Sequence, residues 1–328
     1  MSYSWGDDGA GRSVARDDGY DYKSARKAYD DVPMRASGSM RSSLGGESRL
    51  HDYRSRVGKT EAPVGKELAT TSTHPIAVTI DVTGSMASWP SIFFEKLPLL
   101  GKEVEHYAPD YAISFSVFGD CYADRYPLQV RDFDVGEKLD EHIACLYPEG
   151  GGGDDPEDPS IVAYYYLNHC KMDKAVKPLF FIITDTTSHN TLRSDDIEKY
   201  TGDKSQSKDL DSKSLLQKLG EKFSVYVLLK GNRARGYWQD IVGEQRVKEI
   251  EEPRDIVELV IACIASEMGE IKDYEMRSSK RHADKPERVE RVMKSVKADS
   301  PEIAAEEAGK ASKAGSKKSK SMKSKKLV

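Results

Sequence analysis

The sequence has few cysteines and no pair of them at the spacing of a redox or zinc motif. The four thiols are spread over the chain, at Cys121, Cys145, Cys170 and Cys263. This excludes a dense disulfide framework and a cysteine zinc site. In a chain without an evident secretion signal, the pattern predicts reduced thiols in a cytosol-like compartment.

Long apolar runs and strong charge of one sign are also missing. No run approaches the ~20 residues that a membrane helix needs. The first residues, MSYSWGDDGAGRS, lack the apolar core of a signal peptide. The net charge is only −5, so the overall charge indicates neither a nucleic acid nor a membrane as partner. We therefore expect a cytoplasmic protein that does not enter membranes.

Apolar residues are too scarce for the whole chain to be packed. Charged residues make up 32% of it, and the mean hydropathy is −0.63. We expect a disordered or weakly ordered arm over 1–70, rich in Ser, Gly, Asp, Arg and Tyr. Residues 271–328 read as a polar tail that holds a helix over 285–297 and ends in a lysine-rich stretch. Nucleic-acid binding by that stretch is the weaker alternative, since no aromatic residue lies among its lysines.

Between these ends, residues 71–270 alternate strand and helix patterns. Strands are expected over 76–80, 111–118, 128–133, 176–184, 223–229 and 247–250. Helices are expected over 92–107, 135–144, 160–170, 215–219, 237–242 and 256–268, with a kink or break at Pro98. The strand over 128–133 is expected at an edge, and 187–213 as a long loop with a helical piece. This order predicts an α/β fold with a doubly wound, mostly parallel sheet flanked by helices.

Oxygen-bearing side chains follow three of the expected elements. Asp81, Thr83 and Ser85 come at the end of the first strand, Asp154 lies in a glycine-rich loop before a helix, and Asp185 follows the strand 176–184. Ligands of open parallel sheets bind outside the carboxyl ends of the strands. An all-oxygen set there suits a hard cation such as Mg²⁺. The alternative is that Asp81 caps a turn and the hydroxyls bond to backbone.

Three motifs resemble those of the von Willebrand factor type A (vWA) domain. Residues 81–86, DVTGSM, resemble the first part of its metal-ion-dependent adhesion site, and 151–157, GGGDDPE, resemble the GGGDxPE loop of a subset of the family. Residues 181–185, FIITD, resemble the strand that ends in the family's third-loop aspartate. The resemblance covers about 72–268. It implies a Rossmann-like fold that binds Mg²⁺, or Mn²⁺ or Ca²⁺, and a protein partner whose acidic side chain completes the metal shell.

The resemblance also implies roles for individual residues. Thr83 and Ser85 would ligate the ion through their hydroxyls, and Asp81 and Asp185 directly or through water. Asp154 stands where the commonest second loop of the family has a threonine. A third carboxylate would satisfy more of the ion's charge and weaken its pull on an anionic partner. Whether Asp154 acts through water or the metal is structural is left open.

Three functions follow, of which a metal-dependent protein-interaction module is the first. The second is a Mg²⁺-dependent hydrolase or phosphoryl-transfer enzyme, although no nucleophile or general base accompanies the site, so we expect no enzyme. The third is a structural or assembly protein that contacts partners through its tails. Two sets of polar residues are interpreted as uninvolved: Asp155, Glu157 and Asp158 as solvated loop charges, and His142, His169 and His189 as surface or helix-end residues. The partner and the oligomeric state are left open.

Overall fold

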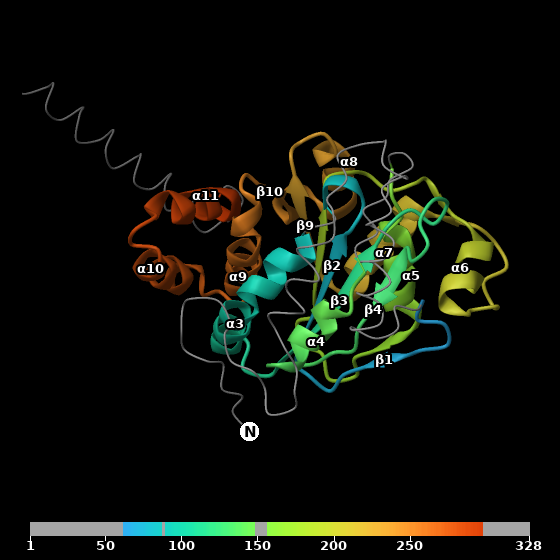
Figure 1. Cartoon of the computed structure of the whole chain (residues 1–328), viewed down its shortest axis with the longest axis horizontal. Coiled ribbons are helices and arrows are strands. Elements are labelled where there is room, and N and C mark those ends of the chain that lie inside the picture. Colours follow the sequence, from blue (N-terminus) through green and yellow to red (C-terminus); the bar gives the residue numbers. More distant parts are fainter. Residues whose placement is uncertain (1–61, 87–88, 148–155, 298–328) are drawn as a thin grey trace, which may run out of the picture.

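The structure is a computed structural model, and it describes residues 62–86, 89–147 and 156–297 (Figure 1). Several expectations fall outside these ranges. They are most of the arm over 1–70, the glycine-rich loop with Asp154, and the lysine-rich end. The alternative in which tails make the contacts therefore concerns residues beyond the described part of the chain.

A six-stranded sheet forms the centre of the molecule. Its strands lie in the order β10 (Val247–Ile250), β9 (Ser224–Lys230), β6 (Leu179–Thr184), β2 (His74–Asp81), β3 (Tyr111–Phe118) and β4 (Leu128–Val130). All neighbours pair in parallel except β3 and β4. The mostly parallel, doubly wound α/β fold predicted from the sequence is confirmed.

The strand order reverses next to β2. The chain first builds outward through β3 and β4, and later returns to the other side of β2 with β6, β9 and β10. In such sheets, the point of reversal leaves a crevice at the carboxyl ends of the strands. The register pairs Ile80 with Ile183 and Asp81 with Phe118, so β2, β3 and β6 end at one edge. Asp81 and Asp185 therefore both lie at the switch point.

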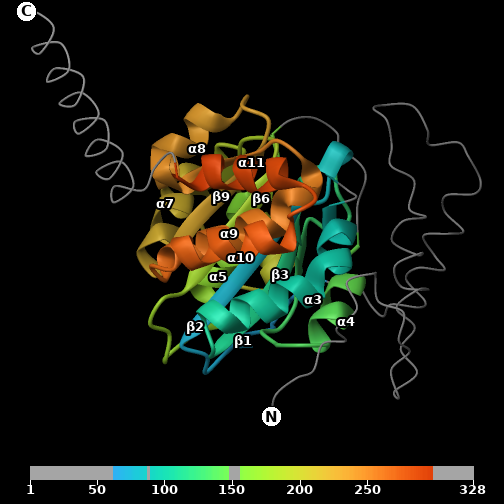
Figure 2. The same cartoon turned by 90° about the vertical axis from the view of Figure 1, so that its left-hand side faces the viewer.

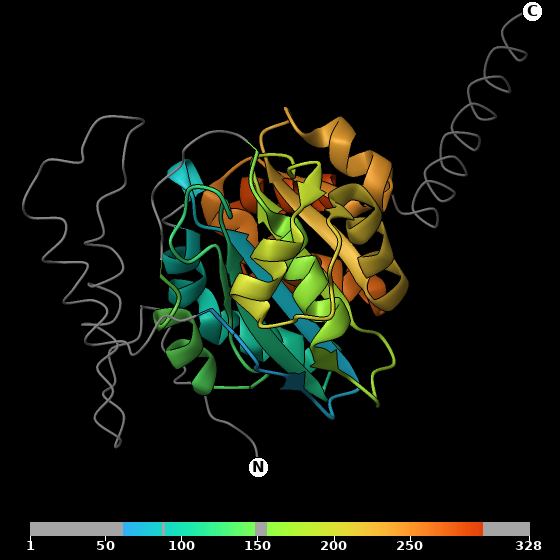
Figure 3. The same ribbon diagram turned by 90° about the vertical axis from the view of Figure 1, so that its right-hand side faces the viewer.

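Helices cover both faces of the sheet because β2 is buried on both sides. Ile76, Val78 and Ile80 pack into one core, and the intervening Ala77 packs into the other. The first face carries α3 (Trp89–Tyr107), α4 (Lys138–Ala144) and α9 (Ile256–Glu267). The second face carries α5 (Pro159–Asn168), α6 (Ser194–Thr201), α7 (Ser212–Lys222) and α8 (Arg235–Val242) (Figures 1 and 3).

Short elements complete the described structure. β1 (Leu68–Ala69) pairs in parallel with β5 (Cys170–Lys171), and β7 (Thr191–Leu192) pairs antiparallel with β8 (Leu210–Asp211). The 3-10 helices are η1 (Gly84–Met86), η2 (Glu244–Arg246) and η3 (Pro253–Asp255). The region 187–213, expected as a loop with a helical piece, thus holds α6 between two short strands.

Two local expectations need correction. Helix α3 begins at Trp89 and runs through Pro98 to Tyr107, so the proline does not break it. The buried stripe of Phe93, Leu97, Leu100 and Val104 holds both halves of the helix against the sheet, and this packing offsets the hydrogen bond that proline lacks. The strand expected over 128–133 is the shorter, antiparallel β4 at the sheet edge.

Two helices extend the packed structure past residue 270. α10 (Ile271–Arg281) and α11 (Pro286–Lys297) lie over α9, on the side away from the sheet (Figure 2). The helix expected over 285–297 is α11. Tyr274 of α10, together with Val292 and Met293 of α11, is buried in the same core as α9. The first face of the sheet is therefore covered by two layers of helix, and the polar sequence after 270 begins with folded structure.

Candidate metal centre

Asp81 ends β2 with a fully buried carboxylate. Its Oδ1 accepts hydrogen bonds from the backbone N–H of Thr83 (2.9 Å) and from the Thr83 hydroxyl (2.6 Å). Its Oδ2 accepts one from the hydroxyl of Thr184 at the end of β6 (2.9 Å). The neighbouring strand thus fixes the Asp81 side chain. Three hydrogen bonds orient the carboxylate, but none of the donors brings a positive charge.

Glu157 brings a second buried carboxyl group to Thr83. It is only 5% exposed and lies within side-chain hydrogen-bonding reach of Thr83. Burial is the largest cause that raises its pKa, and the Asp81 charge raises it further. The pKa of Asp81 is raised as well, by burial first and also by the charge of Asp185. Like charges in a buried site oppose each other's ionisation, so the site favours a cation.

Asp185 follows β6 and is partly exposed. Its Oδ2 lies 3.6 Å from the ammonium of Lys230, at the end of the neighbouring β9. The loop after Asp185 is held by Trp238 of α8, whose indole N–H donates to the Thr186 carbonyl (2.8 Å). The structure therefore brings Asp81, Thr83 and Asp185 together at one edge. It also adds Lys230, which no sequence pattern predicted at this edge.

The other two expected ligands are described less fully. Ser85 lies in η1, directly after Thr83, but its side chain is not among the described ones. Asp154 lies outside the described residues. Whether Asp154 reaches the site is therefore still an expectation from the sequence.

The interpretation of Glu157 and Asp158 as solvated loop charges is wrong. Both are buried, at 5% and 1% exposure. The loop before α5 is tied to the one after β6: the N–H of Glu157 donates to the Thr187 carbonyl (3.3 Å), and that of His189 donates to the Glu157 carbonyl (2.9 Å). Sequence reasoning missed them because a hydrophilic loop after glycines is usually exposed, and only the tertiary fold closes it over β2.

Gly119 makes this close packing possible. A Cβ atom at this position would lie 2.2 Å from Oδ2 of Asp124 and 3.3 Å from the Thr83 side chain. The N–H of Asp158 donates to the Gly119 carbonyl (3.1 Å). The loop after β3 therefore approaches both Thr83 and the start of α5, as a glycine allows.

A second group of candidate ligands lies beside the first. Asp120, Asp158 and His189 each offer one ligand atom, and these atoms lie within 4.8 Å of one another. His189, expected as a surface or helix-end residue, lies partly buried in the loop after β6, and its ring nitrogen Nε2 is 3.5 Å from Oδ1 of Asp120. Asp120 comes two residues after the end of the strand 111–118, so the argument that singled out Asp81 and Asp185 would also have found it.

The donor set fits a divalent cation. Asp81 and Glu157 place their carboxyl groups beside Thr83, and the charge of Asp185 acts on Asp81; burial is the largest cause that raises the pKa of Asp81 and of Glu157. Oε2 of the buried Glu157 also accepts no hydrogen bond. Carboxylate and hydroxyl oxygens are the ligands that Mg²⁺ and Ca²⁺ take in proteins. A cation would oppose both causes of these raised pKa values, the burial of the charges first and their mutual repulsion second.

Comparison with known proteins gave structural likenesses only. No protein-family model matches the chain, and no curated protein matches it. A pilus adhesin, SpaC from Lactobacillus rhamnosus GG, is 12% identical with a TM-score of 0.42, over 64% of this chain and 32% of that one. The proximal thread matrix protein 1 from the mussel byssus is also 12% identical, with a TM-score of 0.43, over 61% and 49%. The matches thus span at most about half of these solved chains.

One of these proteins is a pilus adhesin and the other is a byssus matrix protein. They overturn the expected cytoplasmic location, because a pilus adhesin and a byssus matrix protein point away from the cytoplasm. The expectation failed for a physical reason: the presence of unpaired cysteines is a poor indicator of the cellular compartment of this chain. Cys121, Cys170 and Cys263 are buried, and a buried apolar thiol is inert under either redox condition.

Among the described residues, none of the helices combines the length and the apolar character that a bilayer span requires.

Proposed function

We propose that this chain is a vWA-like module that binds a protein partner in a divalent-metal-dependent manner. Asp81, Thr83, Ser85 and Asp185 would hold the ion, with Asp154 as the second-loop ligand. The ion is Mg²⁺ in this proposal, with Mn²⁺ or Ca²⁺ as substitutes. When bound, it would supply an electrophilic site for an acidic side chain of the partner.

One observation supports the proposal above the others. Two buried carboxyl groups, of Asp81 and Glu157, flank the same threonine, and neither has a cationic hydrogen-bond donor among the interactions described for it. Leaving such charges unbalanced inside a protein costs several kcal/mol each. A fold that retains them at a topological switch point indicates a bound cation.

The chain's own residues prepare this position. Thr184 and the backbone of Thr83 hold the Asp81 carboxylate in one orientation. Trp238 fixes the loop after Asp185 through the Thr186 carbonyl. Lys230 balances part of the charge of Asp185, so a partner carboxylate would meet a site that is less negative than its acids alone suggest.

Calorimetric titration of Mg²⁺ into the full chain tests the metal. We expect one site in the wild type and none in Asp81→Asn. Asp110→Asn is a matched control, since Asp110 also accepts from a threonine N–H and hydroxyl, those of Thr73 (2.8 and 2.9 Å), but precedes β3 at the opposite edge. Equal Mg²⁺ binding by wild type and Asp81→Asn would refute the metal assignment.

A pull-down with and without EDTA tests the interaction. Mass spectrometry should identify a partner that the wild type and Asp110→Asn retain in Mg²⁺, and that EDTA or Asp81→Asn releases. A partner retained equally in EDTA would show that the contact does not depend on the metal.

A further inference from the structure

Asp120, Asp158 and His189 form a compact triad of a different chemical kind from the candidate metal centre. Its three ligand atoms lie within 4.8 Å of one another. The first centre offers only oxygen, whereas this triad adds an imidazole nitrogen. Imidazole suits zinc and other first-row transition metals, and carboxylates alone suit Mg²⁺ or Ca²⁺.

Both carboxylates of the triad are deeply buried and incompletely satisfied. Asp120 is 0% exposed: its Oδ1 accepts from the Tyr122 N–H (2.8 Å), and its Oδ2 accepts no hydrogen bond. Asp158 is 1% exposed: its Oδ2 accepts from the Cys121 N–H (2.8 Å), and its Oδ1 accepts none. Buried polar atoms without a partner are rare, because each costs ~1–3 kcal/mol or more when charged.

Asp158 occupies a position at which a carboxylate normally forms hydrogen bonds with its own helix. It is the N-cap residue of α5, where an aspartate usually accepts from the first N–H groups of the helix. The Asp158 side chain makes no such capping bond. It is directed to the loop after β3 instead, and this leaves an oxygen available toward Asp120 and His189.

His189 is held with its ring nitrogen toward the acids. Its backbone N–H donates to the Glu157 carbonyl (2.9 Å), and its ring lies 5.1 Å from the Tyr122 ring. Nε2 has no hydrogen-bond partner and lies 3.5 Å from Oδ1 of Asp120, too far for a good hydrogen bond. Two ligands at ~2.1 Å on a tetrahedral zinc ion lie about 3.4 Å apart, so the separation suits ligands of one ion.

We propose that Asp120, Asp158 and His189 form a second cation site, selective for a divalent transition metal such as Zn²⁺ and separate from the Asp81 centre. The competing explanation for the close approach of these three side chains is an ion pair in which a protonated His189 interacts with both carboxylates. One imidazolium would leave a net negative charge between two buried acids. A divalent ion with a neutral imidazole balances both.

The site would stabilise the loops that frame the first centre. Asp120 follows β3, Asp158 begins α5, and His189 follows β6, so a single ion would join three chain segments. Glu157, the neighbour of Asp158, faces Thr83 instead. The proposal is independent of Mg²⁺ binding at Asp81, although it predicts that the transition metal rigidifies the loop that carries Glu157.

The test is calorimetric titration of Zn²⁺ into the chelator-stripped full chain in excess Mg²⁺, with Co²⁺ absorption as a reporter of the ligands. We expect one Zn²⁺ site and Co²⁺ ligand-field bands. His189→Ala and Asp120→Asn should weaken binding by more than the roughly 10–100-fold that loss of an outer-shell partner costs. Asp81→Asn should leave Zn²⁺ binding unchanged, which separates this site from the proposed Mg²⁺ site.

His142→Ala is the matched control. Its Nε2 lies 4.0 Å from Oδ2 of Asp134, and its side chain is 18% exposed against 21% for His189. Circular dichroism identifies any variant that fails to fold, and His189→Asn then replaces His189→Ala. No Zn²⁺ binding by the folded wild type would overturn the proposal in favour of the imidazolium ion pair. Binding that survives in His189→Ala, or that is lost in Asp81→Asn, would also overturn it.

Discussion

Glu157 shows at the scale of one residue how a loop charge becomes part of a site. It lies in a hydrophilic segment, yet its carboxyl group is 5% exposed beside Thr83. Its backbone joins the loop after β6, through Thr187 and His189. Burial of an acid without a cation is costly. The buried position of Glu157 therefore indicates a positively charged ligand, although its hydrophilic segment alone would suggest an exposed loop.

Glu157→Gln should weaken Mg²⁺ binding by roughly tenfold, because it removes one negative charge next to Asp81. In EDTA the variant should melt at the wild-type temperature or above it, because an amide never has to carry a charge in this buried position. Thermal denaturation with and without Mg²⁺ measures both effects. Glu198→Gln, at an exposed residue of α6, serves as the control. A lower melting temperature in EDTA would contradict this account of Glu157.

Lys230 is a positively charged side chain at the candidate metal centre. Lys230→Met should strengthen Mg²⁺ binding by roughly tenfold at low salt, because the ammonium 3.6 Å from Asp185 repels a divalent ion. The gain should shrink as salt screens the charge. Titration calorimetry measures it, with Lys213→Met as the control, since that ammonium lies 3.4 Å from Asp240 of α8. Weaker binding in Lys230→Met would show that the lysine supports the site.

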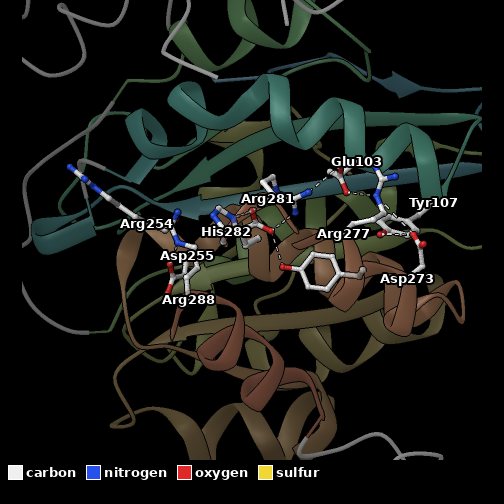
Figure 4. Close-up of polar contacts among 11 residues, drawn as sticks. Glu103, Tyr107, Arg254, Asp255, Asp273, Arg277, Arg281, His282 and Arg288 are labelled. Carbon is white, nitrogen blue, oxygen red and sulfur yellow. Dashed lines mark hydrogen bonds and ion pairs between the residues drawn. The ribbon is translucent and has the colours of Figure 1, made fainter. Parts of the chain in front are cut away.

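At the scale of elements, α9 joins the sheet to the outer helices through a buried acid. Glu258 of α9 accepts from the guanidinium of Arg281 (3.1 and 2.9 Å), lies 2.6 Å from the His282 ring, and accepts from the Tyr274 hydroxyl (2.8 Å). Glu103 of α3 accepts from Arg277 of α10 (3.1 and 2.7 Å). Figure 4 shows Glu103, Arg277, Arg281 and His282 of this cluster between the helices.

Glu258→Ala should lower the free energy of unfolding by about 3–5 kcal/mol, because it removes the buried acid of this cluster and leaves the half-buried Arg281 only its contact with Glu103 (3.3 Å). Glu251→Ala is the control: its pair with Lys294 (3.0 Å) is exposed and should contribute at most about 1 kcal/mol. Urea denaturation at neutral pH measures both. Similar losses in the two variants would contradict the importance of burial.

The same residue predicts acid sensitivity. Burial alone would raise the pKa of Glu258, but the hydrogen bonds from His282 and Arg281 outweigh it and lower the pKa from 4.5 to about 2. A lowered pKa adds stability above the unfolded-state value, and this stability is lost as the pH falls from about 4.5 to 2. The stability difference between wild type and Glu258→Gln should therefore shrink over this range. A difference that stays constant would contradict the prediction.

For the whole molecule, the outer helices decide where the folded unit ends. α9 is buried along nearly its whole length, from Ile256 to Ala265, which the sheet alone cannot achieve. α10 and α11 bury five large side chains against it: Tyr274, Val289, Val292, Met293 and Val296. At ~1.5–3 kcal/mol each, their burial is comparable to the ~5–15 kcal/mol that stabilises a typical domain.

A chain that ends at residue 270 should therefore be unstable or aggregate, whereas one that ends at 297 should melt like the full chain. Circular dichroism melting and size-exclusion chromatography of the two truncations provide the comparison. Equal melting of both would show that the domain ends at 270 after all.

The strand and helix order was determined by the sequence itself, because local patterns carry it. The β-branched run over 76–80 and the alternation over 111–118 predict β2 and β3 correctly, since burial on both faces leaves a local signature. The position of Asp81, Thr83 and Asp185 at one edge of the sheet could be predicted for the same reason: each lies at or just after a strand end, and the strands are parallel. The apolar stripe predicted the helix over 285–297, but the sequence did not predict that this helix packs against α9.

Only the tertiary structure decided which side chains share a site. Glu157, Asp158 and His189 lie in polar segments without periodicity, and they meet because the loops after β3 and β6 close over the start of α5. Strand order decided the contact between Asp185 and Lys230, since β6 and β9 are neighbours in the sheet but not in the chain. Long-range contacts of this kind leave no local pattern, so the sequence predicted a candidate site at the sheet edge, and only the fold decided which other side chains lie beside it.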